Sequence, residues 1–145
     1  MIKMLRFLFF VFLARLAIGI KDAEANSMLT AYAKGTSYGG NAAFWVKLHT
    51  GDPGSAGTAN AAGNTTRQQA AFGTASGGSI ATNADLVWTN VSTAETYTHV
   101  SFWTASSAGT FLGSDDLAAS KTVAVGDTFT IPSGSLSIAI TPVAA

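Results

Sequence analysis

The sequence predicts a mainly β protein, with a single β-sandwich or jelly-roll-like domain preceded by an N-terminal α-helical segment. From Gly35 onward, short runs rich in Val, Ile, Thr and aromatic residues alternate with turn residues, at intervals of roughly 8 to 15 residues. Fourteen of the fifteen glycines lie in this part of the chain. Short strands at this spacing with glycine-rich turns are typical of sandwiches and barrels.

Eight segments have the composition of strands. They are residues 43–50, 67–73, 85–90, 97–104, 109–113, 121–125, 127–131 and 135–141. Between the first two, the Gly-Asp-Pro-Gly sequence at residues 51–54 indicates a tight turn, because proline presets φ and glycine accepts positive φ. Residues 55–66 have no apolar periodicity, which predicts a long exposed loop.

Residues 97–104 alternate strictly. The alternation predicts that Tyr97, His99, Ser101 and Trp103 share one face of the sheet.

Residues 1–34 differ from the rest, and we expect them to form an apolar, basic arm on the β domain of residues 35–145. The arm holds five basic and two acidic residues, whereas the remainder holds three basic and six acidic ones. Its longest apolar run, residues 7–14, is eight residues long, well under the roughly 18 that span a membrane. An apolar helix of this kind needs a partner surface. The residues expected to contact another subunit are Phe7, Phe9, Phe10, Phe12 and Leu13.

Other interpretations of the arm stay open. A basic start, an apolar core and an Ala-Glu-Ala sequence at residues 23–25 also fit a signal peptide cleaved after Ala25, or a membrane anchor. Met28 could also open the chain.

The overall composition indicates assembly. Only 11% of the residues are charged, against about one quarter in ordinary soluble domains. A protein with so few charges usually hides part of its surface in an oligomer or a larger particle. The acidic β domain argues against nucleic acid as a partner. Without cysteine, disulfides and thiol chemistry are excluded.

Candidate catalytic residues are few. His49 and Asp52 could form a base and its orienting carboxylate, but the sequence has no Gly-x-Ser-x-Gly nucleophile motif. The simpler interpretation is structural: His49, Asp52 and Pro53 hold the end of a strand and the turn that follows. His99, between aromatic neighbours, is expected to be a half-buried strand residue.

Metal and cofactor motifs are also lacking, so we expect a non-enzymatic protein with no cofactor. Asp115 and Asp116 fit the cap of a turn better than a calcium site.

The three tryptophans, Trp45, Trp88 and Trp103, fall on predicted strands. Tryptophans exposed in a row would suit sugar binding, whereas strand tryptophans of a small β domain are more often part of its core.

Three segments resemble a family of short bacteriophage virion proteins, often labelled tail fibre or minor tail proteins and common in phages of actinobacteria. The segments are "KDAEANSMLTAYA" from Lys21, "WVKLHTGDPGSAGTANAAGNTTRQQAAF" from Trp45 and "YTHVSFWTASSAGTFLGSDDL" from Tyr97. The apolar leader, residues 1–20, departs from the family pattern. The resemblance implies a structural role for the Leu-His-Thr-x-Asp-Pro-Gly motif.

The sequence therefore predicts a virion structural protein, either a capsid decoration or cement protein or a component of the tail fibre. Its expected partners are other virion proteins, major capsid or tail proteins among them, copies of itself as a homo-oligomer, and a glycan of the host surface. The alternative is a secreted carbohydrate-binding module with an N-terminal signal peptide.

Overall fold

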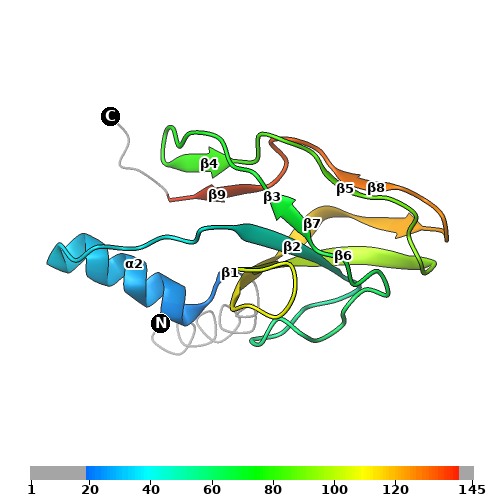
Figure 1. The fold of residues 1–145 in the computed structure, drawn as a ribbon, viewed down its shortest axis with the longest axis horizontal. Coiled ribbons are helices and arrows are strands. Elements are labelled where there is room, and N and C mark those ends of the chain that lie inside the picture. Colours follow the sequence, from blue (N-terminus) through cyan, green and yellow to red (C-terminus); the bar gives the residue numbers. More distant parts are fainter. Residues whose placement is uncertain (1–18, 141–145) are drawn as a thin grey trace, which may run out of the picture.

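The structure, a computed structural model, describes residues 19–140. These residues form antiparallel β-sheets with one N-terminal helix, which confirms the predicted mainly β class. The strands lie in two layers, and the helix extends from one end of them (Figure 1).

The larger layer is a five-stranded sheet in the spatial order β1-β7-β6-β2-β3. Its strands are β1 (Gly19–Ile20), β2 (Phe44–His49), β3 (Gln68–Ala70), β6 (Glu95–Trp103) and β7 (Phe111–Val123). β6 lies at the centre of the sheet, and β2 pairs with it from Trp45 opposite Trp103 to His49 opposite His99. The two central strands therefore supply side chains to both faces of the sheet.

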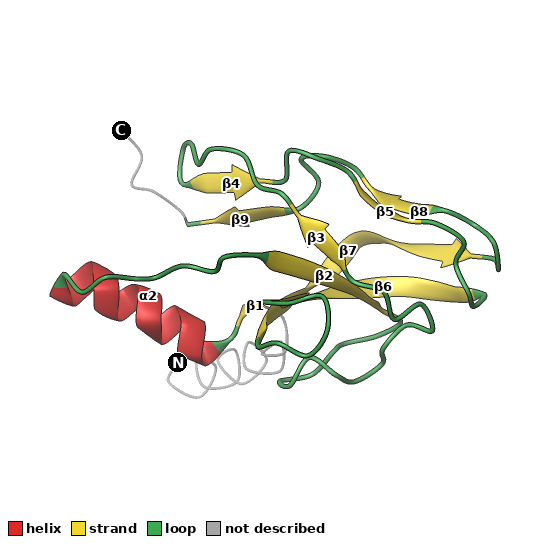
Figure 2. Cartoon of the chain, viewed as in Figure 1, coloured by secondary structure: helices red, strands yellow, loops and turns green. Residues whose placement is uncertain are grey.

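The second layer consists of two separate two-stranded sheets along one face of the larger one (Figure 2). One sheet joins β4 (Ser79–Ala81) to β9 (Ser137–Ala139), and the other joins β5 (Leu86–Trp88) to β8 (Phe129–Ile131). The gap between the two layers is filled by the hydrophobic core.

Alternate residues of the strands supply that core. Trp88, on β5, is 1% exposed and stacks at a tilt on Phe129 of β8, with ring centroids 5.7 Å apart. Tyr97 of β6 meets the same Phe129 edge-on at 5.1 Å. Val46 and Leu48 of β2 belong to the same cluster and are fully buried. Each such side chain contributes about 1.5–3 kcal/mol by leaving water, so this cluster is the main source of the stability of the sandwich.

Helix α2 (Asp22–Lys34) begins where β1 ends and projects beyond the sandwich. Gly35 ends it in a left-handed conformation, φ 66°, with its N–H bonded to the carbonyl of Ala31 at 3.0 Å. None of the helix residues is buried. Its N-cap, Lys21, is tied to the β domain by its N–H, which donates to the Leu112 carbonyl at 2.7 Å.

Most of the predicted strands are present, with three corrections. β1 and β4 were not predicted, because each is only two or three residues long and lacks apolar alternation. The predicted strands 109–113 and 121–125 are parts of one strand, β7. Asp115 and Asp116, expected to cap a turn, lie within β7 opposite Val100 and His99. The turn prediction was wrong because pairing with the long β6 carries the chain through this polar stretch.

The strict alternation predicted for residues 97–104 is broken by a β-bulge. Tyr97 of β6 lies opposite Lys121 of β7, whereas His99, two residues later, lies opposite Asp116, five residues earlier in β7. The extra β7 residues have no partner, and the bulge shifts the faces of the strand. Tyr97 consequently lies in the same core cluster as Val100, although strict alternation places them on opposite faces.

The predicted division of the chain into an arm, residues 1–34, and a β domain, residues 35–145, stays a prediction. Phe7, Phe9, Phe10, Phe12 and Leu13 lie outside the described residues.

Candidate functional site

The outer face of the five-stranded sheet is covered by the loop that follows β2. This loop, residues 50–64, turns back over the sheet and makes a bridge between His49 and Ala61. Gly57 lies so close to the Phe111 ring of β7 that a Cβ atom there would be 2.2 Å from the ring. Part of the segment predicted to be exposed is therefore packed: Gly57, Ala62 and Asn64 are buried.

His49 is fully buried beneath this loop. Its Nδ1 lies 2.8 Å from the carbonyl oxygen of Ala59, and its Nε2 lies 2.7 Å from Oγ of Ser101. A carbonyl only accepts, so Nδ1 carries the proton and Nε2 accepts from the Ser101 hydroxyl. Ser101 Oγ in turn accepts the indole N–H of Trp103 at 2.8 Å.

The surroundings of His49 keep its ring neutral. Burial lowers the pKa of His49 below its usual value, an effect opposed by the hydrogen bond to the Ala59 carbonyl and reinforced by nearby Lys47. With a neutral ring, the three successive hydrogen bonds, from Trp103 to Ser101, from Ser101 to His49 and from His49 to Ala59, each have one donor and one acceptor. Both ring nitrogens are thus engaged by groups other than Asp52, in an arrangement unlike a base and its orienting carboxylate.

Asp52 and Pro53 shape the turn above His49. The Asp52 carboxylate accepts the N–H of Gly54 at 2.8 Å, and the carbonyl of Asp52 accepts the Asn60 side-chain amide at 2.8 Å. Pro53 is fully buried, and its carbonyl accepts the N–H of Ala59 at 3.0 Å. These bonds fix the loop at the position where Ala59 meets His49. The structural role predicted for the motif remains a prediction that mutagenesis must test.

Arg67 lies on the same face of the sheet, over the ring of Trp103. Its guanidinium lies 4.0 Å from the centre of the Trp103 ring and donates to the carbonyls of Ala105 and Ala108, each at 2.7 Å. Lys47 is nearby, and burial together with the Arg67 charge lowers the pKa of Lys47. Arg67 therefore joins the entry of β3 to the β6–β7 turn.

The tryptophans do not present a row of exposed rings. Trp88 is in the core and donates its indole N–H to the Thr66 carbonyl at 2.8 Å. Trp103 is only 8% exposed under Arg67, and Trp45 is half-buried. Within residues 19–140, no cluster of three His, Asp or Glu side chains is placed to hold a metal ion.

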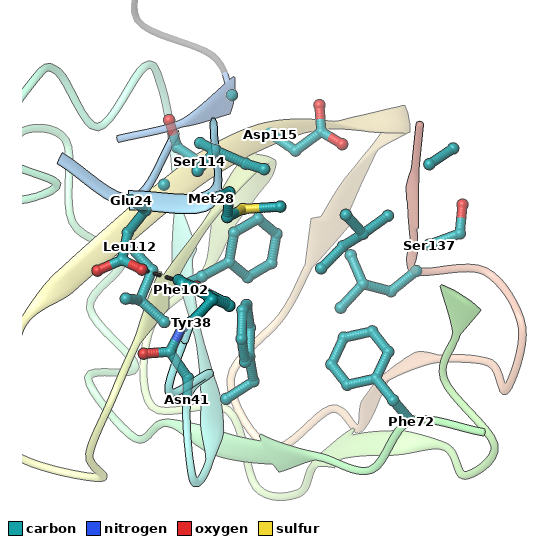
Figure 3. Close-up of a pocket in the computed structure, with 17 residues that line it drawn as sticks. Glu24, Met28, Tyr38, Asn41, Phe72, Phe102, Leu112, Ser114, Asp115 and Ser137 are labelled. Atoms are coloured by element: carbon teal, nitrogen blue, oxygen red, sulfur yellow. Dashed lines mark hydrogen bonds between the residues drawn. The ribbon is translucent and has the colours of Figure 1, made fainter. Parts of the chain in front are cut away.

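A second candidate site lies where the two layers separate, beside α2. We call it the α2–β9 groove, and it has a volume of about 440 Å³. Its apolar walls come from Met28 of α2, Phe44, Phe72, Phe102, Leu112 and Ile138. Figure 3 shows Met28 and Leu112 toward one side of the groove and Ser137 of β9 on the opposite side.

Local distortions of the chain build this groove. A second irregularity between β6 and β7 leaves Leu112 without a β6 partner, so Phe111 packs under the outer loop while Leu112 lines the groove. At the mouth, Tyr38 donates its hydroxyl proton to the Glu24 carboxylate at 3.0 Å and ties the segment after α2 to the helix. Burial, and secondarily this bond, raise the pKa of Tyr38.

The groove is acidic as well as apolar. Glu24 and Asp115 are the charged residues among those that line it. Burial raises the pKa of Asp115, an effect opposed by the hydrogen bond from the Asp116 N–H and reinforced by the Asp116 charge. A cation near Asp115 would make ionisation of this carboxyl group more favourable, because an opposite charge stabilises the carboxylate.

Sequence reasoning missed this groove. Its walls come from segments as distant as Ile20 and Ile138, and no local motif connects them. The sequence did identify His49, but its partner Ser101 lies 52 residues away and could not be assigned.

A search of curated proteins found no match to this chain. Within the described residues, no helix is long and apolar enough to cross a bilayer. A family model described as "Podophage GP4 fiber I protein gp80" matches residues 19–139, which include helix α2 and nearly the whole β domain. The chain therefore belongs to this family of phage fibre proteins, which are structural and non-enzymatic components of the virion.

Proposed function

We propose that the chain is a tail-fibre subunit whose N-terminal part, residues 1–34, makes the contact that incorporates it into the particle. The family match supports the fibre role, and it begins only at Gly19. The apolar residues Phe7, Phe9, Phe10, Phe12 and Leu13 precede that match. In this proposal they dock on a neighbouring subunit while the β domain faces outward.

The observation that carries the proposal is the solvent exposure of helix α2. The helix has 13 residues, and none of them is buried. Leu29 and Tyr32 lie on one side of it and are 65% and 93% exposed. Isolated helices of this length are marginal in water, because most helical stability in proteins comes from packing. A neighbouring subunit would supply the packing that residues 19–140 do not.

The proposal is tested by replacing Phe9, Phe10 and Phe12 with serine in the phage genome. Copies of the chain per purified particle are then counted by quantitative mass spectrometry. We expect incorporation to fall at least about tenfold, because each docked aromatic side chain contributes about 1.5–3 kcal/mol.

The matched control replaces exposed apolar residues of the β domain, Val87 and Val125, which are 37% and 67% exposed. This double serine variant should be incorporated normally. Unchanged incorporation of the phenylalanine variant, or equal loss in both variants, would refute a specific role of the N-terminal part.

A further inference from the structure

We infer that the α2–β9 groove is the acceptor for the apolar N-terminal segment, residues 7–13, of a second copy of this chain. The inference rests on the proposed function, in which this segment makes the assembly contact, and it names the surface that receives it. Each copy would then donate its segment to one neighbour and accept the segment of another.

The chemistry of the groove matches that segment. The groove is apolar, with aromatic side chains at its base: Phe44 meets Phe72 edge-on at 5.5 Å and Phe102 at 6.2 Å. Its 440 Å³ lies within the roughly 300–1,000 Å³ of pockets that hold compact apolar ligands. Residues 7–13 read Phe-Leu-Phe-Phe-Val-Phe-Leu, a run of large apolar side chains.

The charges are complementary as well. The charged residues that line the groove, Glu24 and Asp115, are both acidic. Residues 1–18 contain Lys3, Arg6 and Arg15 and no acidic residue, so basic groups flank the apolar run on both sides. Complementary charges of this kind steer encounter and suppress wrong partners. A cation from the segment would also meet Asp115, where burial disfavours the charged carboxylate.

The position of the segment in the chain favours a second copy as its source. Residues 1–18 directly precede Gly19, which with Ile20 lines the same groove. Return of residues 7–13 to the groove of their own chain would require a reversal within residues 14–18, Ala-Arg-Leu-Ala-Ile. That stretch has no Gly, Pro, Asn or Asp, the residues that favour turns, and Gly19, which follows it, is held in β1 opposite Ser114.

Donor segment and acceptor groove are different surfaces, which makes the contact head-to-tail. Such contacts close into rings or extend as filaments, according to the rotation between subunits.

The test uses the full-length chain and two kinds of variant. Acceptor variants are Met28→Lys and Asp115→Lys, which place a cation in the groove that receives a basic segment. Their matched controls are Thr30→Lys, at an exposed position of the same helix, and Asp116→Lys, at the next position of β7. Neither Thr30 nor Asp116 is among the residues that line the groove. The donor variant replaces Phe9, Phe10 and Phe12 with serine.

Sedimentation velocity then measures self-association, and thermal unfolding followed by circular dichroism checks the fold. We expect the unmodified chain and both control variants to associate alike. The acceptor variants should raise the dissociation constant at least about tenfold, corresponding to 1.4 kcal/mol. The donor variant should do the same.

Mixing identifies the source of the segment. A donor variant still has an intact groove, and an acceptor variant still has an intact segment. An equimolar mixture of the two should therefore form a one-to-one complex that neither forms alone. A mixture that stays monomeric, although each variant abolished association, would show that the segment fills the groove of its own chain, and would overturn the inference.

Two other outcomes separate this inference from the proposed function. If the acceptor variants associate normally while the donor variant does not, the groove assignment is wrong, but the role of the N-terminal segment stands. If the unmodified chain does not associate, and the acceptor variants enter particles normally although the donor variant does not, the segment binds another virion protein. That result also refutes the inference and leaves the proposed function in place.

Discussion

Replacing Gly57 with alanine tests how the outer loop is held against the five-stranded sheet. Gly57 has φ +71°, and a Cβ atom there would lie 2.2 Å from Cδ2 of the buried Phe111 ring. Gly54, in the same loop, has nearly the same φ, +70°, but its Cβ would lie 3.8 Å from the nearest atom, Cβ of Ala59. The two positions therefore differ in crowding and share the backbone requirement.

The expected magnitudes follow from these two contributions. A left-handed conformation costs an L-residue about 1–2 kcal/mol, so Gly54→Ala should lower the free energy of unfolding by that amount. Gly57→Ala adds the cost of overpacking, about 1–3 kcal/mol, for a total of about 2–5 kcal/mol. Alanine also restricts the unfolded chain, but this effect is common to both variants and cancels in the difference.

Urea titration of the full-length chain, followed by tryptophan fluorescence, measures both variants. The reasoning predicts that Gly57→Ala is the more destabilising by at least about 1 kcal/mol, at an unchanged slope. Equal losses in the two variants would show that Phe111 does not contact the loop as described, and the account of this face would be wrong.

Three other changes have defined outcomes. Because burial lowers the pKa of His49, the unfolded chain takes up the proton before the folded chain as the pH falls. The free energy of unfolding should therefore be constant above about pH 6.5 and fall below it by up to about 1.4 kcal/mol per pH unit. Urea titrations from pH 7 to 5 should show a smaller dependence on pH for His49→Gln than for the unmodified chain. Arg67→Met removes two charged hydrogen bonds and a cation–π contact, and it should lower the free energy of unfolding by about 1.5–3 kcal/mol in the same assay. The control Lys121→Met, at an exposed position, should lower it by under about 0.5 kcal/mol. Equal losses in the two variants would contradict the role of Arg67. Gly113→Ala would set a Cβ 2.2 Å from the Gly19 carbonyl oxygen, so the Lys21 amide should exchange its hydrogen faster, and unchanged exchange would mean that β1 does not lie on β7.

The strands that sequence predicted are those with apolar periodicity. The predicted segments 43–50 and 97–104 are rich in aromatic and β-branched residues, and they form the inner strands β2 and β6 of the larger sheet. β4 could not be predicted because Ser79–Ala81 is short, follows two glycines and gains its strand conformation from pairing with β9. Asp115 and Asp116 were predicted to lie in a turn because aspartate is uncommon in strands, but pairing with β6 overrides this local preference.

The candidate sites divide in a similar way. The sequence pointed to His49, Asp52 and Pro53 because a strand end and a proline turn are local patterns. It could not give the bonding partners of His49, since Ser101 arrives through sheet register. The groove depends on bulges in β7 and on the separation of the two layers, which are consequences of packing that no short segment encodes.

The bulge in β7 also limits how this protein can aggregate. Among the described residues, β1 covers the outer edge of β7 only at Gly113 and Ser114, which leaves most of a thirteen-residue strand open at that edge. A flat edge of that length would be a template for strand addition, the route by which β proteins coalesce into amyloid. The unpaired stretch between Asp116 and Lys121 bends the strand and disrupts its ladder of hydrogen bonds. An edge interrupted in this way is a poor template for the sheet of a neighbouring copy.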